Sequence, residues 1–532
     1  MSQKSKRIYL ALILLISLVG GGIAAYTTRN GPWGYTDSVS YLATARNIAN
    51  GTGVGYYEAD AAFSFATIQP FFYPLVISPF ALAGADVVAT ARWLGVAAFM
   101  LVIFLGGWLF VRSGRNPSLG VAVSALLCIF PHMVLMACSA MTEPLFLLLL
   151  LASGAAMLAY FSNGKSRWLV LGALLTGLLP VTKYVGVACL LSGALSVLFL
   201  AEGKFWKRVG QTALFSALAV LPIVAWLGWV YVVEGHSVAG RAFDLRLAAE
   251  NFGNFRGIFT ETVWKWLPFQ ESGKMFRYLV KLALMALTVL GAPLAAYFAL
   301  KRIRQTDRTN AASPDNRIFV FFGLAALSFV LVFAATHAFT FPTPDINNRT
   351  LIPLYVSTGM SLAGAFSLVL SAWGVKKLRF LHLLPWLALT VSLFSYVPRT
   401  LAVVNYYLPG DGLTAYAWDR SETIEAVRAL PEGTPVISND WELLMLWADR
   451  PVYGLWNTFP QDGSQTTAYG TNPADRAQTI FCAEGAVLVI FGDFDSQVRK
   501  TIGEAYLPQL PALFGSLSVH GEYMDGMIYT CP

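Results

Sequence analysis

The first 400 residues alternate between long apolar runs and short polar connections. After a first apolar run at 8–26, further runs cover 87–111, 118–136, 141–161, 167–181, 184–201, 209–232, 276–300, 317–337, 350–372 and 380–398. Apolar runs of about 18 residues or more are typical of membrane-spanning helices. The pattern therefore predicts a polytopic α-helical membrane protein with about 11 transmembrane helices.

Two apolar segments need a separate interpretation. The run at 8–26 could be a cleaved signal peptide, but the many later runs and the poor cleavage pattern favour a retained span. Residues 71–84 are apolar but short, and they contain Pro74 and Pro79. We expect this segment to be juxtamembrane or re-entrant.

Charge in the connections predicts the orientation. With the N-terminus inside, the inner connections are "VRSGRNPS", "SNGKSR", "EGKFWKR", "KRIRQTDR" and "GVKKLR", all basic. The outer loops 27–70 and 233–275 carry most of the acids found between spans. The positive-inside rule then places the N-terminus in the cytoplasm, and an odd number of spans places the C-terminal part outside the cell membrane.

The polar C-terminal part predicts a small α/β domain. "RSETIEAVRALPEGTPVISND" predicts an amphipathic helix, a turn and a short strand, "GAVLVIFGDFD" predicts a strand and a turn, and "DGMIYTC" predicts a final edge strand. We therefore expect a transmembrane domain at 1–399 and an extracytoplasmic domain at 400–532.

Composition supports a membrane class. Of 532 residues, 56% are hydrophobic and 13% are charged, whereas soluble domains average about 25% charged residues. The net charge of +7 comes from the basic connections, without an aromatic-interleaved basic patch, so no nucleic-acid partner is expected. Cys482 and Cys531 could form a disulfide if the tail is extracytoplasmic, although two buried free thiols fit equally well.

The lone acid of "YTDSVSYLATARNIANG" is the first candidate for chemistry. Thr36 or Asp37 could simply cap a helix that stops at Gly51. Alternatively, Asp37 could serve as a general base at the outer membrane surface, because a carboxylate beside an apolar wall can accept a hydroxyl proton. Tyr41 shares its helix face and could orient a ligand or pack.

Three further ionisable residues lie at the predicted outer ends of apolar runs. Glu143 opens one run and could compensate the helix dipole or act as a second carboxylate. Lys183, in the break "LLPVTKYVG", could snorkel from a turn or hold a phosphate. Arg349, in "DINNRTLIPLY", could anchor the interface or clamp a phosphate.

Other candidates are weaker. Arg241 and Arg246 lie in the second outer loop and could contact a substrate. The chain contains no H-E-x-x-H, no G-x-S-x-G and no complete P-loop, which argues against a zinc protease, a serine hydrolase and a P-loop nucleotidase. No cofactor is certain, and a divalent cation between Asp37 and Glu143 stays open as a weak, hard-cation site.

Five stretches, in order, resemble the GT-C superfamily of integral membrane glycosyltransferases, in the branch of protein O-mannosyltransferases and aminoarabinose transferases. They are "YTDSVSYLATARNIANGTG", "QPFFYPLVISPFALAG", "MTEPLFLLLLLASGAAMLAY", "GLLPVTKYVGVACL" and "DINNRTLIPLY". The resemblance covers roughly residues 8–400, and the tail is similar to the outer domain of bacterial members.

The resemblance implies a sugar donor linked to polyprenyl phosphate, which lies among the membrane lipids. It also implies a lipid, glycan or protein acceptor. Asp37 would deprotonate the acceptor, Lys183 and Arg349 would hold the departing phosphate, and the transfer would invert the anomeric centre. The chain departs from the family where Ser38 replaces the second acid of a frequent pair. It also departs where Lys183 and Tyr184, both expected to bind the donor or the acceptor, stand in place of a frequent Arg-Tyr pair.

Three rival functions remain open at this stage. A lipid or glycan transporter or flippase would favour broken helices and repeated halves, and no internal repeat is found. A glycan polymerase or ligase with a diphosphate-linked donor would keep the enzyme class. A scaffold without catalysis would gain support if Asp37 only capped a helix.

Overall fold

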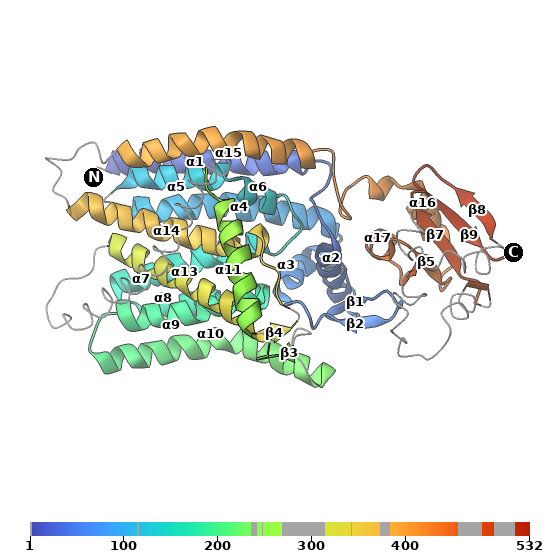
Figure 1. Cartoon of the computed structure of the whole chain (residues 1–532), viewed down its shortest axis with the longest axis horizontal. Coiled ribbons are helices and arrows are strands. Elements are labelled where there is room, and N and C mark those ends of the chain that lie inside the picture. The colour runs from blue at the N-terminus through green and yellow to red at the C-terminus, as the bar shows by residue number, and fades with distance from the viewer. Residues whose placement is uncertain are drawn as a thin grey trace. The chain divides into compact units, whose positions relative to one another are not determined.

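A computed structural model describes residues 3–113, 116–235, 242–246, 248–268, 314–341, 343–372, 383–455, 481–482, 484–493 and 517–532. The chain divides into two compact units (Figure 1). The helical unit comprises Met1–Thr27, Thr67–Tyr73 and Trp93–Tyr406, and the mixed unit comprises Thr28–Ala66, Pro74–Arg92 and Tyr407–Pro532. Each unit consists of several separate segments of the chain, whereas the predicted domains meet at a single boundary near residue 400. That boundary stays a prediction.

The helical unit is built mainly from apolar helices (Figure 1). These helices are α1 (Gln3–Thr27), α4 (Val87–Ser113), α5 (Pro117–Ile129), α6 (Pro131–Ala137), α7 (Glu143–Asn163), α8 (Ser166–Thr182), α9 (Val187–Leu200), α10 (Phe205–Glu234), α11 (Ala248–Trp264), α13 (Pro314–Phe339), α14 (Asn348–Ala372) and α15 (Leu384–Tyr407). Helix α11 runs across α13 in the view of Figure 1 and packs on it. Two short strands, β3 (Ala242–Phe243) before α11 and β4 (Thr340–Phe341) after α13, pair in antiparallel orientation.

The polytopic membrane class is confirmed. Seven helices of the described residues are long and apolar enough to cross a membrane, and the bent pair α5–α6 raises this to eight. The described residues do not confirm a count of eleven. The predicted span at 276–300 lies outside them, and the predicted span at 118–136 is broken by a bend of 64° before Pro131, because proline cannot donate the helical hydrogen bond.

The predicted break at Lys183 is confirmed as an interruption between two short apolar helices. Helix α8 ends at Thr182, Lys183 has the extended φ of −157° and ψ of 128°, and a single 3-10 turn, η1 (Tyr184–Gly186), leads into α9. A Cβ at position 186 would clash with the backbone of Leu179 and Pro180. Glycine therefore allows the chain to fold back at this point.

The segment predicted not to span does form a short helix, α3 (Phe72–Leu82). It has 11 residues, which corresponds to about 16 Å of helix against a hydrocarbon core of about 30 Å. Its length agrees with the juxtamembrane or re-entrant prediction.

The mixed unit combines helices with a five-stranded sheet. Its elements are α2 (Thr36–Ala49), the hairpin of β1 (Gly55–Tyr57) and β2 (Phe63–Phe65), η4 (Trp418–Arg420), α16 (Glu422–Ala429), β5 (Val436–Ser438), α17 (Trp441–Trp447), β6 (Tyr453–Gly454), β7 (Val487–Phe491), β8 (Ser518–Glu522) and β9 (Gly526–Thr530). The strand order is β6-β5-β7-β9-β8. Strand β5 pairs in parallel with β6 and β7, whereas β9 pairs antiparallel with β7 and β8.

The predicted α/β character of the tail is confirmed, with one error. The predicted helix and strands correspond to α16, β5, β7 and β9, and Ser421 caps α16 by accepting a bond from the Ile424 amide at 3.0 Å. Strand β9 is not an edge strand, because β8 lies outside it. Strand β8 is short and mostly exposed, so its sequence lacks the apolar alternation by which a strand is recognised.

The tail also contains a disulfide and a compact apolar core. Cys482 and Cys531 are joined across 49 residues, with their Cα atoms 5.2 Å apart. Cys531 packs against a buried cluster that includes Ile437, Leu488 and Ile490. The disulfide therefore ties the residue after β9 to the segment before β7.

Candidate functional site

A buried carboxylate with two cations forms the centre of the helical unit's candidate site. Glu143 Oε1 accepts a bond from Lys183 Nζ at 2.6 Å and lies 3.5 Å from Arg349 Nε. The Glu143 side chain is 1% exposed, whereas those of Lys183 and Arg349 are 20% and 19% exposed. The two cations thus have the more accessible side chains, while the carboxylate lies behind them.

The three side chains come from different helix ends. Glu143 begins α7 and is followed by Pro144, which suits the first turn because proline needs no backbone donor there. Lys183 follows the last residue of α8, and Arg349 is the second residue of α14. Two cations face one carboxylate in this cluster, an arrangement that can accept an oxyanion.

Aromatic residues support the segment that carries Lys183. Tyr184 donates from its hydroxyl to the Thr67 carbonyl at 3.2 Å and accepts a bond from Trp226 Nε1 at 3.0 Å. Phe71 packs on Trp226 with a centroid separation of 4.8 Å. Tyr184, predicted to bind ligand, therefore positions the break by bonding to two neighbouring segments. No pattern in the sequence marks Trp226 for this role, because it lies within an ordinary apolar helix.

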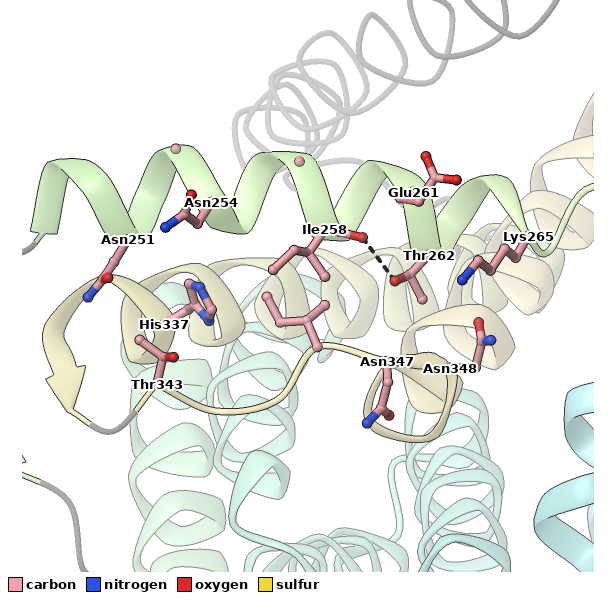
Figure 2. A pocket seen from close by; sticks show the side chains of 13 residues that line it. Asn251, Asn254, Ile258, Glu261, Thr262, Lys265, His337, Thr343, Asn347 and Asn348 are labelled. Carbon is pink, nitrogen blue, oxygen red and sulfur yellow. Dashed lines mark hydrogen bonds between the residues drawn. The ribbon is translucent and has the colours of Figure 1, made fainter. Parts of the chain in front are cut away.

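A second feature of the helical unit is a polar pocket of about 730 Å³ between α11 and the connection from α13 to α14 (Figure 2). Its lining residues are Asn251, Gly253, Asn254, Gly257, Ile258, Glu261, Thr262, Lys265, His337, Thr343, Ile346, Asn347 and Asn348. Sequence reasoning missed this pocket. The signal was available in "ENFGN" and "DINN", two amide-rich stretches in a mostly apolar chain.

Asp37 lies in the first turn of α2, in the mixed unit. Tyr35, and neither Thr36 nor Asp37, occupies the N-cap position, so the predicted cap was wrong. The local reason is that Ser38, three residues after Tyr35, accepts a bond from the Tyr35 amide at 3.4 Å. Gly51, predicted as the stop, follows the last turn with a φ of +76°, a left-handed conformation that favours glycine.

Helix α17 lies against this first turn of α2. Thr36 donates from Oγ1 to Glu442 Oε2 at 3.1 Å. Burial raises the pKa of Glu442 to about 7, with smaller upward contributions from the charges of Asp440 and Asp37, against the bond from Thr36. A carboxyl group that titrates near neutrality therefore faces the same turn as Asp37.

Two tyrosines and an ion pair complete this part of the mixed unit. Burial raises the pKa of Tyr56, whose hydroxyl is also affected by a bond with Ser40 and by the charges of Glu58, Glu442 and Asp37. Tyr41 is 7% exposed, and its side chain is part of the core. Arg46, near the end of α2, binds Asp449 at 2.8 Å.

The other predicted site residues are less informative. Arg241 lies outside the described residues. Arg246 is 89% exposed and binds Asp244 at 2.9 Å, which lowers the pKa of that carboxyl. Within the described ranges, no group of three or more His, Cys, Asp or Glu side chains could hold a metal ion. Asp37 and Glu143 belong to different compact units, and a shared cation stays a prediction.

Comparison with known proteins identifies the fold. No protein-family model and no curated protein matches the sequence. The structure is similar to that of ArnT from Cupriavidus metallidurans bound to undecaprenyl phosphate, with 13% identity and a TM-score of 0.54 over 99% of this chain and 98% of that chain. For the apo state of ArnT the identity is 12% and the TM-score is 0.58, over the same shares.

A second similar structure is the oligosaccharyltransferase AglB from Archaeoglobus fulgidus, in complex with an inhibitory peptide and a dolichol-phosphate. It shares 13% identity and a TM-score of 0.54 over 100% of this chain and 75% of that chain. ArnT and AglB are both GT-C membrane glycosyltransferases. The chain therefore has the GT-C fold, as its sequence resemblance predicted.

Proposed function

We propose that the protein is an inverting glycosyltransferase of the cell membrane. It would move a hexosyl or pentosyl group from a polyprenyl-phosphate-linked donor to a lipid, glycan or protein acceptor on the outer face. The observation that carries the proposal is the cluster of Lys183 and Arg349 around the buried Glu143. The likeness to structures solved with undecaprenyl phosphate and dolichol-phosphate supports the same donor class.

The cluster suits a lipid phosphate for physical reasons. A phosphate ester that leaves a sugar develops negative charge, and preorganised cations stabilise that charge most effectively where water is scarce. Arg349 can bind two phosphate oxygens through its planar guanidinium, whereas Lys183 supplies a point charge. Glu143 holds both cations in place when the phosphate is absent.

Asp37 is the proposed general base. The acceptor hydroxyl would lose its proton to the Asp37 carboxylate while its oxygen forms a bond to the anomeric carbon. The bond from that carbon to the phosphate oxygen would break, and its electron pair would stay on the phosphate held by Lys183 and Arg349. A single displacement of this kind inverts the configuration at the anomeric carbon.

The proposal is tested by transfer of radiolabelled sugar from polyprenyl-phosphate donors in membranes. Asp37→Asn removes the base but keeps the size of the side chain, and we expect a loss of about 10²- to 10⁴-fold in transfer rate. Asp60→Asn, at an exposed acid of the same loop that only accepts the Ala62 amide, serves as the matched control and should retain activity.

Two results would contradict the proposal. Equal activity of Asp37→Asn and wild type would remove the base assignment. If wild-type membranes transferred no sugar from any donor but moved the labelled lipid across the bilayer, the protein would be a flippase. The breaks between α5 and α6 and between α8 and α9 would then resemble the discontinuous helices of transporters.

A further inference from the structure

We infer that the polar pocket beneath α11 binds a neutral polyhydroxylated group, the sugar of a glycan acceptor. This inference rests on the proposed function, because it assigns one acceptor class to the same enzyme. The pocket's volume of about 730 Å³ lies within the range of small-molecule sites. Its wall is rich in amide and hydroxyl side chains, which is uncommon in a chain with 56% hydrophobic residues.

The charge of the lining favours a neutral ligand. Glu261 on α11 and Lys265, directly after its end, are the acid and the base that line the pocket, and they carry opposite charges four positions apart. An anionic phosphate gains more from the Lys183–Arg349 cluster, where two cations share one carboxylate. The two features of the helical unit are therefore suited to different chemical groups.

Several polar groups of the pocket are oriented in advance. Asn347 Oδ1 accepts the Thr350 amide at 3.0 Å, and Asn348 Oδ1 accepts Trp266 Nε1 at 3.2 Å. With their oxygens engaged in this way, both side chains present their NH₂ groups as donors. The sequence places these two amides side by side at the start of α14.

His337 supplies the complementary acceptor. Its Nδ1 lies 3.2 Å from the Pro344 carbonyl, which can only accept, so the proton of this bond belongs to Nδ1. In the neutral ring, Nε2 then accepts a hydrogen bond. Amide donors and an imidazole acceptor around one pocket match a sugar, since each of its hydroxyl groups both donates and accepts.

Two glycines provide independent support. Gly253 and Gly257 lie within α11 and line the pocket, although glycine in a helix interior costs about 1 kcal/mol relative to alanine. A Cβ at either position would meet no atom within 4 Å. Close packing therefore does not require glycine here, and the absence of side chains instead leaves room in the pocket.

One wall residue of the pocket is next in sequence to a residue of the proposed phosphate site. Asn348 lines the pocket, and the next residue, Arg349, lies 3.5 Å from Glu143. Consecutive Cα atoms are about 3.8 Å apart. A sugar bound by Asn348 would thus be held by the same helix turn that holds the donor phosphate, which is the proximity that group transfer requires.

The test uses the full chain in detergent and three neutral disaccharides, maltose, cellobiose and N,N′-diacetylchitobiose, with binding followed by saturation-transfer NMR. Gly257→Leu fills the pocket and replaces a poor helix former by a good one, so we expect the protein to fold and at least a tenfold loss in disaccharide affinity. Gly228→Leu on α10 is the matched control, because its Cβ also meets no atom and it does not line the pocket.

Binding of at least one disaccharide, lost in Gly257→Leu and kept in Gly228→Leu, supports the inference. It is overturned if no disaccharide binds the wild type, if Gly257→Leu binds equally well, or if a Ser/Thr-rich peptide binds and the sugars do not. A parallel titration with a short polyprenyl phosphate, in wild type and Lys183→Met, separates the two proposals. Lipid binding without sugar binding would overturn the pocket assignment alone, whereas sugar binding without lipid binding would overturn the donor assignment alone.

Discussion

Glu143 is buried and Glu442 is half-buried, and their surroundings differ. Glu143, in the helical unit, has two cations within 3.5 Å. Glu442, in the mixed unit, accepts a bond from Thr36 and is influenced by the negative charges of Asp440 and Asp37. The first carboxylate lies beside two cations, whereas burial and like charges raise the pKa of the second to about 7.

The comparison shows that neighbours determine what a buried acid can do. A carboxylate paired with cations holds them in position. A phosphate can then replace the carboxylate as their hydrogen-bond partner. A carboxyl group with acidic neighbours titrates near neutral pH and can influence the protonation of the groups beside it. The predictions below test this difference.

The largest effect is expected at Glu143. Glu143→Gln leaves Lys183 and Arg349 without their shared carboxylate, and removing one partner of a buried pair should lower the free energy of unfolding by about 3 kcal/mol. A lower midpoint of thermal unfolding in detergent would show this, and added polyprenyl phosphate should restore part of the loss by supplying a new anion.

The control for this variant is Glu250→Gln, at an exposed acid in the first turn of α11. Equal unfolding midpoints for the two variants would show that Glu143 is not the counterion of the cluster. If polyprenyl phosphate did not restore any of the stability lost in Glu143→Gln, the cluster would be a structural ion pair without a phosphate-binding role.

An intermediate effect is expected at Glu442 and should depend on pH. Between the ordinary Glu pKa of 4.5 and the folded-state value of about 7, the unfolded chain releases a proton that the folded chain keeps. The free energy of unfolding should therefore fall as pH rises through this window, by about 1–2 kcal/mol. Glu442→Gln should flatten the dependence, as measured by thermal unfolding at pH 4.5 to 8.

Glu422→Gln, at an exposed acid of α16, is the matched variant and should keep the wild-type slope. The comparison between the two acids would fail if Glu442→Gln and the wild type lost stability equally between pH 4.5 and 7. Stability that instead rose with pH in the wild type would mean that the folded protein favours the ionised form of Glu442.

The smallest effect is expected at the ion pair between Arg46 and Asp449. Their N–O distance of 2.8 Å resembles that of Lys183 and Glu143, but the side chains are 20% and 62% exposed. Solvent screening should limit the coupling energy to about 0.5 kcal/mol. A double-mutant cycle of Arg46→Gln and Asp449→Asn measures this energy, and a value near that of the buried cluster would show that burial does not separate the two classes of pair.

Local features of the fold were largely predictable from the sequence. The break around Lys183 follows from a proline and a charge between two short apolar runs, and α3 follows from the brevity of its apolar segment. Strand β8 was missed because exposed polar residues dominate it. The N-cap of α2 was misplaced by one or two residues, since Thr36 and Asp37 are better capping residues than Tyr35.

The candidate site was predictable only in part. The sequence shows Glu143, Lys183 and Arg349 as charges beside apolar runs, and ionisable residues at such positions are candidates for function. It also marks Asp37 as the one acid within its helical stretch, Thr36–Ala49. It does not show that Glu442, from the far end of the chain, accepts a bond from Thr36, or that Tyr184 bonds to Thr67 and Trp226.

The membrane class of this protein follows from its amino-acid sequence alone, because the length of apolar runs and the charge of the connections are local properties that a membrane acts on directly. Which charges come together depends on the tertiary fold. Glu143 and Arg349 are 206 positions apart in numbering, and Thr36 and Glu442 are 406 apart. Such contacts depend on how whole helices pack. Hydrophobic periodicity predicts the helices, but it does not predict which polar side chains will contact one another.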